Sequence, residues 1–360
     1  MIVLDNIVFE LTQTGGVSRY WSETIKELIK KKIKINFLEG KNALKNYDRK
    51  KILLPDQIIP DKGPILSRRF LNPKINSNIF HSSYYRTSKL SKFNVVTIHD
   101  FMNEKYPFHP RDFILARIKK NACKRADHIV VVSECTKNDL INFYPFVDPN
   151  MISVIPNGVS DSFFPEISSS EIFIQGNIIE PKNYFLYVGT RGMCKNFKYA
   201  LSIFSEAKKR NKNHKLVIVS KLPLDKNEFK LANSLGINTN DLVQIEYVDN
   251  SLLRLLYSNC LALLIPSKYE GFGLPALESS KCGSIVIGAK GSALDEVVGE
   301  SEYMINLSKK NEIKRVLDLD FYKEDATKES KRLLERSKNF SWAKSVSKLE
   351  NIYKTLIKEI

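Results

Sequence analysis

The sequence predicts an α/β protein built from two doubly wound, Rossmann-like domains that face a central cleft. The chain of 360 residues is longer than one typical core and fits two domains of comparable size. In both halves short apolar runs alternate with helical patterns, and such runs are typical of strands buried on both faces of a parallel sheet. Ligands of such sheets bind beyond the carboxyl ends of the strands, so the loops after the strands are the candidate sites.

The domain boundaries follow from changes in pattern along the chain. We place the first domain at residues 1–165, a linker at 166–182 and the second domain at 183–342. The linker is placed where Pro, Ser and Gly occur without strong periodicity. The second domain then opens on the apolar run Tyr184–Val188, which reads as its first strand.

The chain is strongly basic, with 56 Lys and Arg against 40 Asp and Glu and a net charge of +16. A basic surface admits nucleic acid or an anionic membrane as a partner. The aromatic residues do not interleave with the basic runs in a recognisable RNA-binding phrase, so we expect no nucleic-acid partner. Peripheral contact with an anionic membrane stays open, and a basic nucleic-acid or membrane-binding module is the alternative outside enzymes.

The cysteines and the N-terminus indicate the compartment. The five cysteines are odd in number and show no Cys-x-x-Cys spacing, which favours reduced thiols and argues against a zinc site. The first residues carry no basic region ahead of an apolar core, and no apolar run is long enough to span a bilayer. We therefore expect a cytoplasmic protein.

The most informative stretch runs from the apolar strand at 261–265 through a glycine turn into a helix. Such a joint is an anion site, because unpaired amides and the helix dipole both favour negative charge there. Glu270 and Glu278 flank this positive end; they would repel a phosphate, so we expect them to face the hydroxyl-rich parts of a ligand. An ordinary turn with two solvated glutamates is equally supported by this stretch alone. The amides expected to point at solvent are those of Gly271, Phe272, Gly273 and Leu274.

A second loop follows the strand at Tyr184–Val188 and carries two cations, Arg191 and Lys195. Arginine offers a fork for phosphate oxygens and lysine a compact charge, so the two can clamp one diphosphate across a turn. Two ordinary surface cations are the alternative.

Two features of the first domain also follow predicted strands. Gly15 and Gly16 lie between a strand and a helix, where the absence of a Cβ lets backbone approach a ligand, although a merely tight turn is equally supported. His99 ends the apolar run at 95–98 and is therefore placed where chemistry can occur. A histidine held by a backbone carbonyl is its alternative.

Together these motifs resemble the retaining glycosyltransferases of family four, enzymes of the two-domain GT-B fold. The likeness extends over nearly the whole chain and is strongest from Tyr184 to Gly299. It rests on the Glu-x7-Glu spacing, the Gly-Gly loop and a histidine after the strand at 95–98, and on further elements at Gly189, Arg191, Lys195, Asn196 and Phe197.

The resemblance implies transfer of a hexose from a nucleotide-diphosphate sugar to a glycan or lipid-linked glycan hydroxyl, with retention at the anomeric carbon. Bacterial polysaccharide or O-antigen assembly is the implied setting. No metal cofactor is expected, because cations and a helix terminus replace the divalent ion. A GDP-, UDP- or dTDP-linked donor stays open, and a nucleotide-sugar epimerase of the same architecture is the alternative among enzymes.

The resemblance also assigns roles to residues. Glu278 would hold the ribose hydroxyls and Glu270 a hydroxyl of the donor sugar. Arg191 and Lys195 would neutralise the leaving diphosphate, and His99 would contact the donor sugar near the reacting carbon. The amides of the glycine turn would support the sugar, and Gly15 and Gly16 would lie against the phosphate end. As in GT-B enzymes, the final helix, at about 343–360, is expected to pack back on the first domain.

Overall fold

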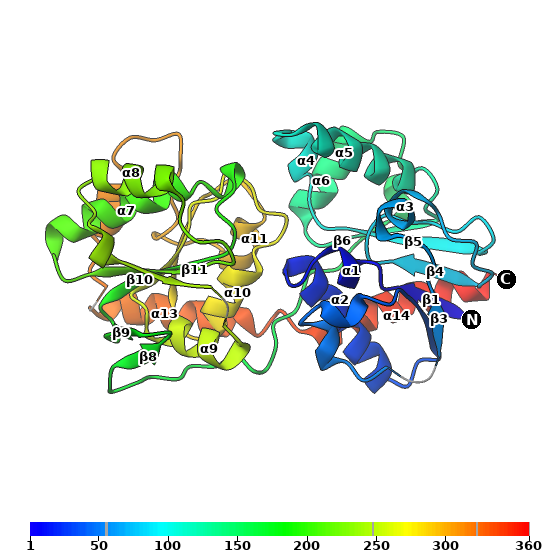
Figure 1. Cartoon of the computed structure of the whole chain (residues 1–360), viewed down its shortest axis with the longest axis horizontal. Helices are drawn as coiled ribbons and strands as arrows, with labels where there is room; N and C mark the ends of the chain where they lie inside the picture. The colour runs from blue at the N-terminus through cyan, green and yellow to red at the C-terminus, as the bar shows by residue number, and fades with distance from the viewer. Residues whose placement is uncertain (55–56, 247, 322, 360) are drawn as a thin grey trace. The chain divides into compact units, whose positions relative to one another are not determined.

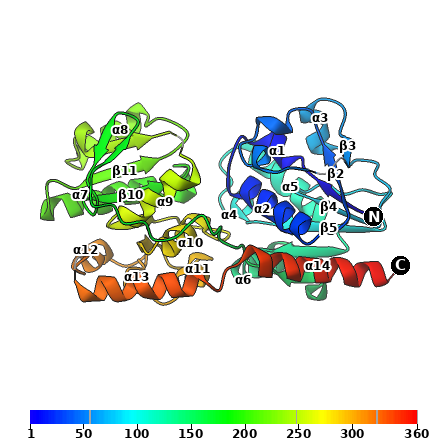
Figure 2. The same cartoon turned by 90° about the horizontal axis from the view of Figure 1, so that it is seen from below.

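The computed structural model of the chain describes residues 1–54, 57–246, 248–321 and 323–359 (Figure 1). It divides into two compact units. Unit 1 contains Met1–Gly158 together with Ser341–Ile360, and unit 2 contains Val159–Phe340. Each unit is a parallel sheet covered by helices (Figures 1 and 2), so the predicted α/β class with two doubly wound domains is confirmed.

The sheet of unit 1 has the strand order β3-β2-β1-β4-β5-β6-β7, with every pair parallel. The central strands are fully buried because apolar side chains occupy both faces. The chain order reverses between β1 and β4, which makes their carboxyl ends the topological switch point where ligands bind in such sheets. The strands are β1 Ile2–Asp5, β2 Ile35–Glu39, β3 Ile58–Pro60, β4 Ile79–Ser82, β5 Phe93–Ile98, β6 His128–Val131 and β7 Ile152–Val154.

The helices of unit 1 include one from the far end of the chain. Helix α14 packs against α2, and its Tyr353 hydroxyl lies 2.6 Å from Nδ1 of His81 on β4. The C-terminal segment thus belongs to unit 1. The helices are α1 Val8–Leu11, α2 Gly16–Lys30, α3 Ile65–Phe70, α4 Met102–Lys105, α5 Pro110–Cys123, α6 Glu134–Phe143 and α14 Trp342–Lys358, with 3₁₀ turns at Ala43–Lys45, Arg49–Lys51 and Pro149–Met151.

The sheet of unit 2 has the order β12-β11-β10-β13-β14 and is also parallel. Its chain order reverses between β10 and β13, so the loops after these two strands meet at the switch point. The strands are β10 Tyr184–Val188, β11 Lys215–Val219, β12 Leu242–Ile245, β13 Ala262–Ile265 and β14 Ile285–Gly288. The helices are α7 Phe197–Arg210, α8 Lys226–Ser234, α9 Asn250–Asn259, α10 Leu274–Lys281, α11 Leu294–Val298, α12 Glu312–Leu317 and α13 Glu324–Ser337, with 3₁₀ turns at Met193–Lys195 and Thr239–Asp241.

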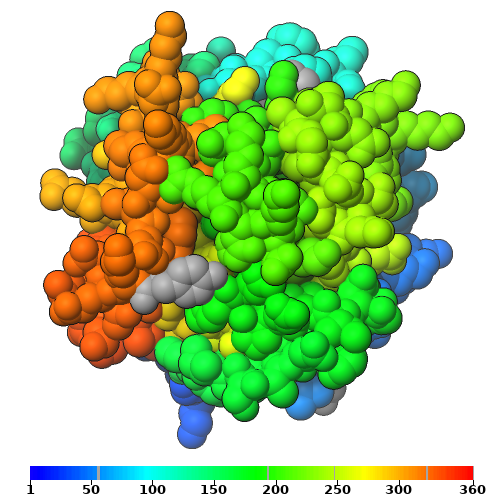
Figure 3. Space-filling view, turned by 90° about the vertical axis from the view of Figure 1, so that its left-hand side faces the viewer, coloured from blue at the N-terminus to red at the C-terminus, as the bar shows by residue number. Residues whose placement is uncertain are grey.

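Residues 166–182 were expected to form a linker, but the structure has an ordered antiparallel hairpin of unit 2 there, β8 Ile172–Ile174 and β9 Asn177–Ile179. Alternation explains it: Ile172 and Ile174 point inward and are buried, while Phe173 between them is exposed. The amide of Ser168 also donates to Asn259 Oδ1 at 2.8 Å. The hairpin lies at the lower edge of the face in Figure 3. The first unit accordingly ends at Gly158, before the boundary expected at 165.

Among the described residues no helix is both long enough and apolar enough to cross a bilayer.

Candidate active site

The loops after β10 and β13 are joined by several contacts at the switch point of unit 2. The amide of Lys268 donates to the carbonyl of Cys194 at 2.7 Å, and Asn196 Nδ2 donates to the carbonyl of Pro266 at 3.0 Å. The Lys195 ammonium lies 2.7 and 2.8 Å from the two carboxylate oxygens of Glu270. Lys195 and Glu270, which the sequence placed in separate motifs, therefore form one charged pair.

The start of α10 next to this pair depends on a glycine. Gly273 has φ +98°, a conformation that side-chain-bearing residues rarely adopt, and a Cβ there would lie 2.6 Å from Leu294 Cδ2. Leu274 begins the helix and Pro275 follows, a position where the missing N–H is harmless. The local sequence thus fixes a sharp entry into α10 directly after Glu270.

The glycine turn is less open than its sequence predicted. The residues of the turn are buried, and the ring of Phe272 packs edge-on against Phe340 at 5.8 Å. No hydrogen bond within the described part of the chain uses the amides of Phe272, Gly273 or Leu274 as donors, while Gly271 has a partner. The N-terminus of α10 thus keeps amides available for an anion, but inside the unit and not at its surface.

Glu278, the second glutamate of the motif, is also buried, with 3% of its surface exposed. It lies on α10, where the Tyr257 hydroxyl donates to its Oε2 at 3.2 Å. The alternative prediction, an ordinary turn with two solvated glutamates, is therefore wrong for Glu278. A buried carboxylate held in one orientation is suited to accept hydrogen bonds from neutral hydroxyl groups.

Arg191 does not share a target with Lys195. Its guanidinium group forms an ion pair with Glu228, with Nε 2.7 Å from Oε1, and donates to the carbonyls of Leu222 and Pro223 at 2.9 and 2.7 Å. Its side chain is 7% exposed. Because most of its donors are engaged, Arg191 ties the loop after β10 to the segment that leads into α8. The spacing of the two cations indicated a joint clamp, and the structure directs them to different partners.

In unit 1, Gly15 and Gly16 form the N-terminus of α2 and are exposed. Ser18 donates to the carbonyl of Gly15 at 3.0 Å and to Asp48 Oδ2 at 2.6 Å, which holds the start of the helix in place. A Cβ built on Gly15 meets nothing within 4 Å. The glycine loop is therefore an accessible helix terminus.

His99 follows β5 and is buried against the ring of Tyr20, with ring centroids 4.8 Å apart. Within the described residues its Nε2 has no hydrogen-bond partner. Burial lowers the pKa of His99 from 6.5 to about 4; the Asp100 carboxylate opposes the shift and the Lys119 cation adds to it. His99 is therefore neutral at neutral pH and offers an unused ring nitrogen.

His81, which lies within β4 of the same sheet, differs in this respect. Its Nδ1 lies 2.6 Å from the Tyr353 hydroxyl and its Nε2 lies 2.8 Å from the Thr97 hydroxyl. Both ring nitrogens are thus engaged inside unit 1, and burial lowers the pKa of His81 to about 3. His81 is a structural histidine that connects β4 with β5 and α14.

Unit 1 should lose stability as the pH falls below about 6.5. Between the folded pKa of a buried histidine and its ordinary value of 6.5, the unfolded chain binds more protons than the folded one. Neutral His81 and His99 therefore contribute fully to the free energy of unfolding above pH 6.5. This contribution is lost as the pH falls toward the folded-state pKa, which is about 3 for His81 and about 4 for His99. At pH 5 the free energy of unfolding of unit 1 should be lower than at pH 7 by about 2 kcal/mol for each of the two histidines. Urea unfolding followed by tryptophan fluorescence measures this, because Trp21 and Trp342 both lie in unit 1.

The matched variant for this measurement is His99→Asn. Its free energy of unfolding should depend less on pH, by about 2 kcal/mol between pH 7 and pH 5. An unchanged pH dependence would show that His99 is not a neutral buried group.

Lys119 is a residue that the sequence did not reveal. It stands next to Lys120 in a basic stretch of the sequence, yet its side chain is 0% exposed. Its ammonium group donates to the Asp100 carbonyl at 2.7 Å and to Glu104 at 2.9 Å, and it lies 4.7 Å from the centroid of the Phe101 ring. It therefore fixes the segment that follows His99. In α5 it shares the buried face with Ala122 and Cys123, three and four residues further on, and this helical spacing from two small residues is a signal in the sequence that could have indicated its burial.

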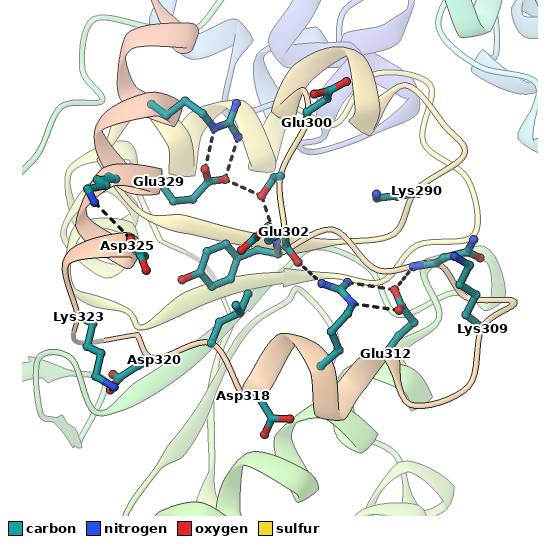
Figure 4. A pocket seen from close by; sticks show the side chains of 17 residues that line it. Lys290, Glu300, Glu302, Lys309, Glu312, Asp318, Asp320, Lys323, Asp325 and Glu329 are labelled. Atoms are coloured by element: carbon teal, nitrogen blue, oxygen red, sulfur yellow. Dashed lines mark hydrogen bonds and ion pairs between the residues drawn. The ribbon is translucent and has the colours of Figure 1, made fainter.

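A hollow of about 1150 Å³ in unit 2 shares no residue with these loops (Figure 4). Carboxylates and cations on its walls neutralise one another, as in the Arg315–Glu312 pair at 3.0 Å and the Arg332–Glu329 pair at 2.6 Å. Its walls carry seven carboxylates and six cations, so it offers no net positive charge for a nucleotide. Among the described residues no group of three or more His, Cys, Asp or Glu is arranged to hold a metal ion.

Both units match known protein families. Residues 14–163 match the family described as Glycosyltransferase Family 4, and residues 168–340 match Glycosyl transferases group 1. The Escherichia coli serotype-specific mannosyltransferase WbdA is 26% identical over an alignment of 264 residues, and the match covers 69% of this chain and 32% of WbdA. The Escherichia coli O-antigen chain mannosyltransferase B is 25% identical over an alignment of 289 residues, and the match covers 77% of this chain and 74% of that relative. The chain thus spans about a third of the length of WbdA.

A similar fold occurs in a solved structure, that of Anabaena HepE in complex with UDP and glucose. The TM-score is 0.69 at 12% identity, and the alignment covers 98% of this chain and 99% of HepE. At this identity the likeness concerns the fold.

Proposed function

Because the chain belongs to the family-four glycosyltransferases, whose two domains it carries in order, we propose that it transfers a hexose from a nucleotide-diphosphate sugar to a hydroxyl group. The acceptor in this proposal is a glycan or lipid-linked glycan, and the anomeric configuration is retained. The fold is GT-B, as the sequence predicted. The names of the relatives are those of transferases, which favours transfer over epimerisation.

The observation that carries the proposal is the Lys195–Glu270 pair beside the N-terminus of α10, at the switch point of the sheet. A departing nucleoside diphosphate develops negative charge, and a cation and helix amides already in place stabilise that charge without reorganisation. We assign Lys195 to the leaving diphosphate. Glu270, which holds Lys195 in the structure, would then accept a hydrogen bond from a hydroxyl of the transferred sugar.

The remaining candidate residues of each unit receive the roles that the family resemblance implies. Glu278 is assigned to the ribose hydroxyls, because it is buried and fixed by Tyr257. Neutral His99 is assigned to a hydroxyl of the donor sugar, since a neutral imidazole donates or accepts a hydrogen bond without adding charge. The exposed N-terminus of α2 at Gly15 and Gly16 is assigned to the phosphate end of the donor. Positive charge comes from the protein in this proposal, so it requires no metal cofactor.

The relatives narrow the donor and the setting. The names of two relatives from Escherichia coli favour a mannosyl donor and O-antigen or related polysaccharide assembly. HepE, of similar fold, was solved with UDP and glucose, so a UDP-linked donor is the competing choice. We propose a cytoplasmic protein that contacts the inner face of an anionic membrane, where lipid-linked acceptors would be found.

A donor panel tests this function. The protein is incubated with GDP-mannose, UDP-glucose and a dTDP-linked hexose, and the released nucleoside diphosphate is measured with and without a glycan acceptor. We expect release from one donor class, unaffected by a metal chelator, and a product with the donor's anomeric configuration by NMR. An altered nucleotide sugar formed without an acceptor would indicate an epimerase, and the absence of turnover with all donors would overturn the proposal.

Arg191 should act by positioning the loop that carries Lys195. We expect Arg191→Ala and Glu228→Gln each to lower kcat/KM for the donor by about tenfold, and the double variant to be no worse than either, because both break the same ion pair. Glu228→Gln is the informative variant, since it keeps an acceptor for the Asp225 amide at the start of α8. A direct phosphate contact by Arg191 predicts instead that Glu228→Gln leaves turnover unchanged while Arg191→Ala abolishes it.

A further inference from the structure

Residues 46–49 of unit 1 lie against the N-terminus of α2, although the proposed reaction gives them no role. They stand between β2 and β3 and run into the 3₁₀ turn at Arg49–Lys51, and we call them the 46–49 segment. Three of the four side chains are polar and buried: Asn46 is 0% exposed, Asp48 7% and Arg49 5%. Buried polar groups are costly unless they are paired, so their partners show what the segment holds in place.

The 46–49 segment holds the chain just before the glycine loop. Nδ2 of Asn46 donates to the carbonyl of Thr12 at 2.8 Å, and the amide of Tyr47 donates to the carbonyl of Gln13 at 2.9 Å. Only Thr14 separates these two residues from Gly15. The segment therefore fixes the path by which the chain enters the loop.

The 46–49 segment also holds α2 after the glycine loop. Ser18 donates to Asp48 Oδ2 at 2.6 Å, and Ser22 donates to the Asp48 carbonyl at 3.3 Å. The two serines are four residues apart and lie on one face of the helix, so both contacts fix the same face. The contact of Ser18 is the stronger one, because its acceptor is a carboxylate.

Between these attachments the loop itself keeps its donors. No hydrogen bond within the described part of the chain uses the amides of Gly16, Val17 or Ser18 as donors. These amides begin a long helix and carry the partial positive charge that favours an anion. The 46–49 segment thus holds both flanks of the glycine loop and leaves its amides for a ligand.

The segment is itself tied to the sheet. Oδ1 of Asn46 accepts the amides of Asp48 and Arg49 at 2.8 and 2.9 Å. Arg49 donates from Nε and Nη2 to the two carboxylate oxygens of Glu39 at 2.7 and 2.9 Å, and Glu39 is the last residue of β2. The Asp48 carboxylate therefore reaches Ser18 from a fixed position.

We propose that Asp48 is a positioning residue for the donor, which holds the N-terminus of α2 where it receives the phosphate end. The inference rests on the proposed function, which assigns that phosphate end to Gly15 and Gly16. Asp48 acts through Ser18 and contacts no substrate. Since the terminus binds phosphate in the bound donor as well as in the transition state, its displacement raises KM and changes kcat little.

Donor kinetics of three variants test this role. Asp48→Ala should raise KM for the donor by about tenfold and change kcat by less than about threefold, because it removes a charge-assisted hydrogen bond that acts on binding. Asp48→Asn keeps an oxygen for the Ser18 hydroxyl and should stay within about threefold of the original KM. Ser18→Ala removes the same contact, so the double variant with Asp48→Ala should be no worse than Asp48→Ala.

Asp127→Ala is the matched control in the same unit. Asp127 Oδ2 accepts the Asn94 amide at 2.7 Å near the amino end of β5, at the edge of the sheet opposite to the glycine loop. This variant also loses a hydrogen bond to a carboxylate, but it should keep KM within about twofold. An equal rise of KM in Asp48→Ala and Asp127→Ala, or an unchanged KM in Asp48→Ala, would overturn the proposal.

Hydrogen exchange followed by mass spectrometry tests the hold of Asp48 on α2 without any donor. Peptides from residues 12–22 should exchange about fivefold faster or more in Asp48→Ala, and at the original rate in Asp48→Asn and Asp127→Ala. Unchanged exchange in Asp48→Ala would refute the positioning role whatever the kinetics. Faster exchange in Asp48→Ala, in a protein that turns over no donor, would support the hold on α2 and refute the proposed function.

Discussion

Lys195→Ala should lower kcat/KM for donor turnover by about 10²–10³-fold, the usual cost of removing one preorganised group that stabilises developing charge. Two effects add in this case. The leaving diphosphate loses its cation, and Glu270 loses the partner that lies 2.7 Å from its carboxylate. The unneutralised carboxylate of Glu270 would then repel the same phosphate. Released nucleoside diphosphate at several donor concentrations measures the change.

The control is Lys268→Ala in the neighbouring loop. The side chain of Lys268 is exposed, and its backbone amide keeps its hydrogen bond to Cys194 in the variant. This control removes a positive charge from the same region and should leave turnover within about twofold, because a solvated charge contributes little. Similar losses in both variants would point to general electrostatics, and turnover near the original value in Lys195→Ala would refute the role of Lys195.

The sequence predicted both sheets well because buried parallel strands appear in it as short, continuous apolar runs. Runs such as Tyr184–Val188 are apolar on both faces, and the loops after them carry the glycines and charges of the site. The position of the candidate site loops at strand ends therefore followed from pattern alone. What pattern could not supply was strand order, which decides which loops become neighbours.

The charged partners show this limit. Lys195 and Glu270 are 75 residues apart and meet only because β10 lies next to β13. Arg191 and Glu228 are 37 residues apart, and nothing in the spacing of Arg191 and Lys195 indicates that Glu228 engages one of them. Short-range spacing favoured a joint clamp, whereas tertiary contacts gave each cation its own carboxylate.

Burial of polar groups was likewise beyond the sequence. Lys119 stands in a basic run yet is fully buried, because the Asp100 carbonyl and Glu104 on the facing segment accept its hydrogen bonds. His81 lies within β4 and His99 directly follows β5, but of the two only His81 has both ring nitrogens engaged. Such differences depend on side chains brought from distant parts of the chain, and local pattern does not record them.

Gly158→Ala should destabilise unit 1 by about 3 kcal/mol, the upper part of the usual range for overpacking. A Cβ at Gly158 would lie 2.1 Å from the backbone nitrogen of Trp342 and 2.6 Å from the backbone carbon of Ser341. Backbone atoms cannot rotate away as a side chain does, so the start of α14 would have to move. Urea unfolding followed by tryptophan fluorescence measures the loss, since Trp342 is at the point of contact.

Gly158→Ala should also affect His99, because aromatic rings in unit 1 connect Trp342 with this histidine. The ring of Trp342 lies 5.9 Å from that of Tyr20, and Tyr20 lies 4.8 Å from His99. A shift of Trp342 would therefore disturb the residue that covers His99, and we expect lower donor turnover even where the variant remains folded. If Gly158→Ala unfolded at the same urea concentration as the original protein, the close approach of α14 to Gly158 would be refuted.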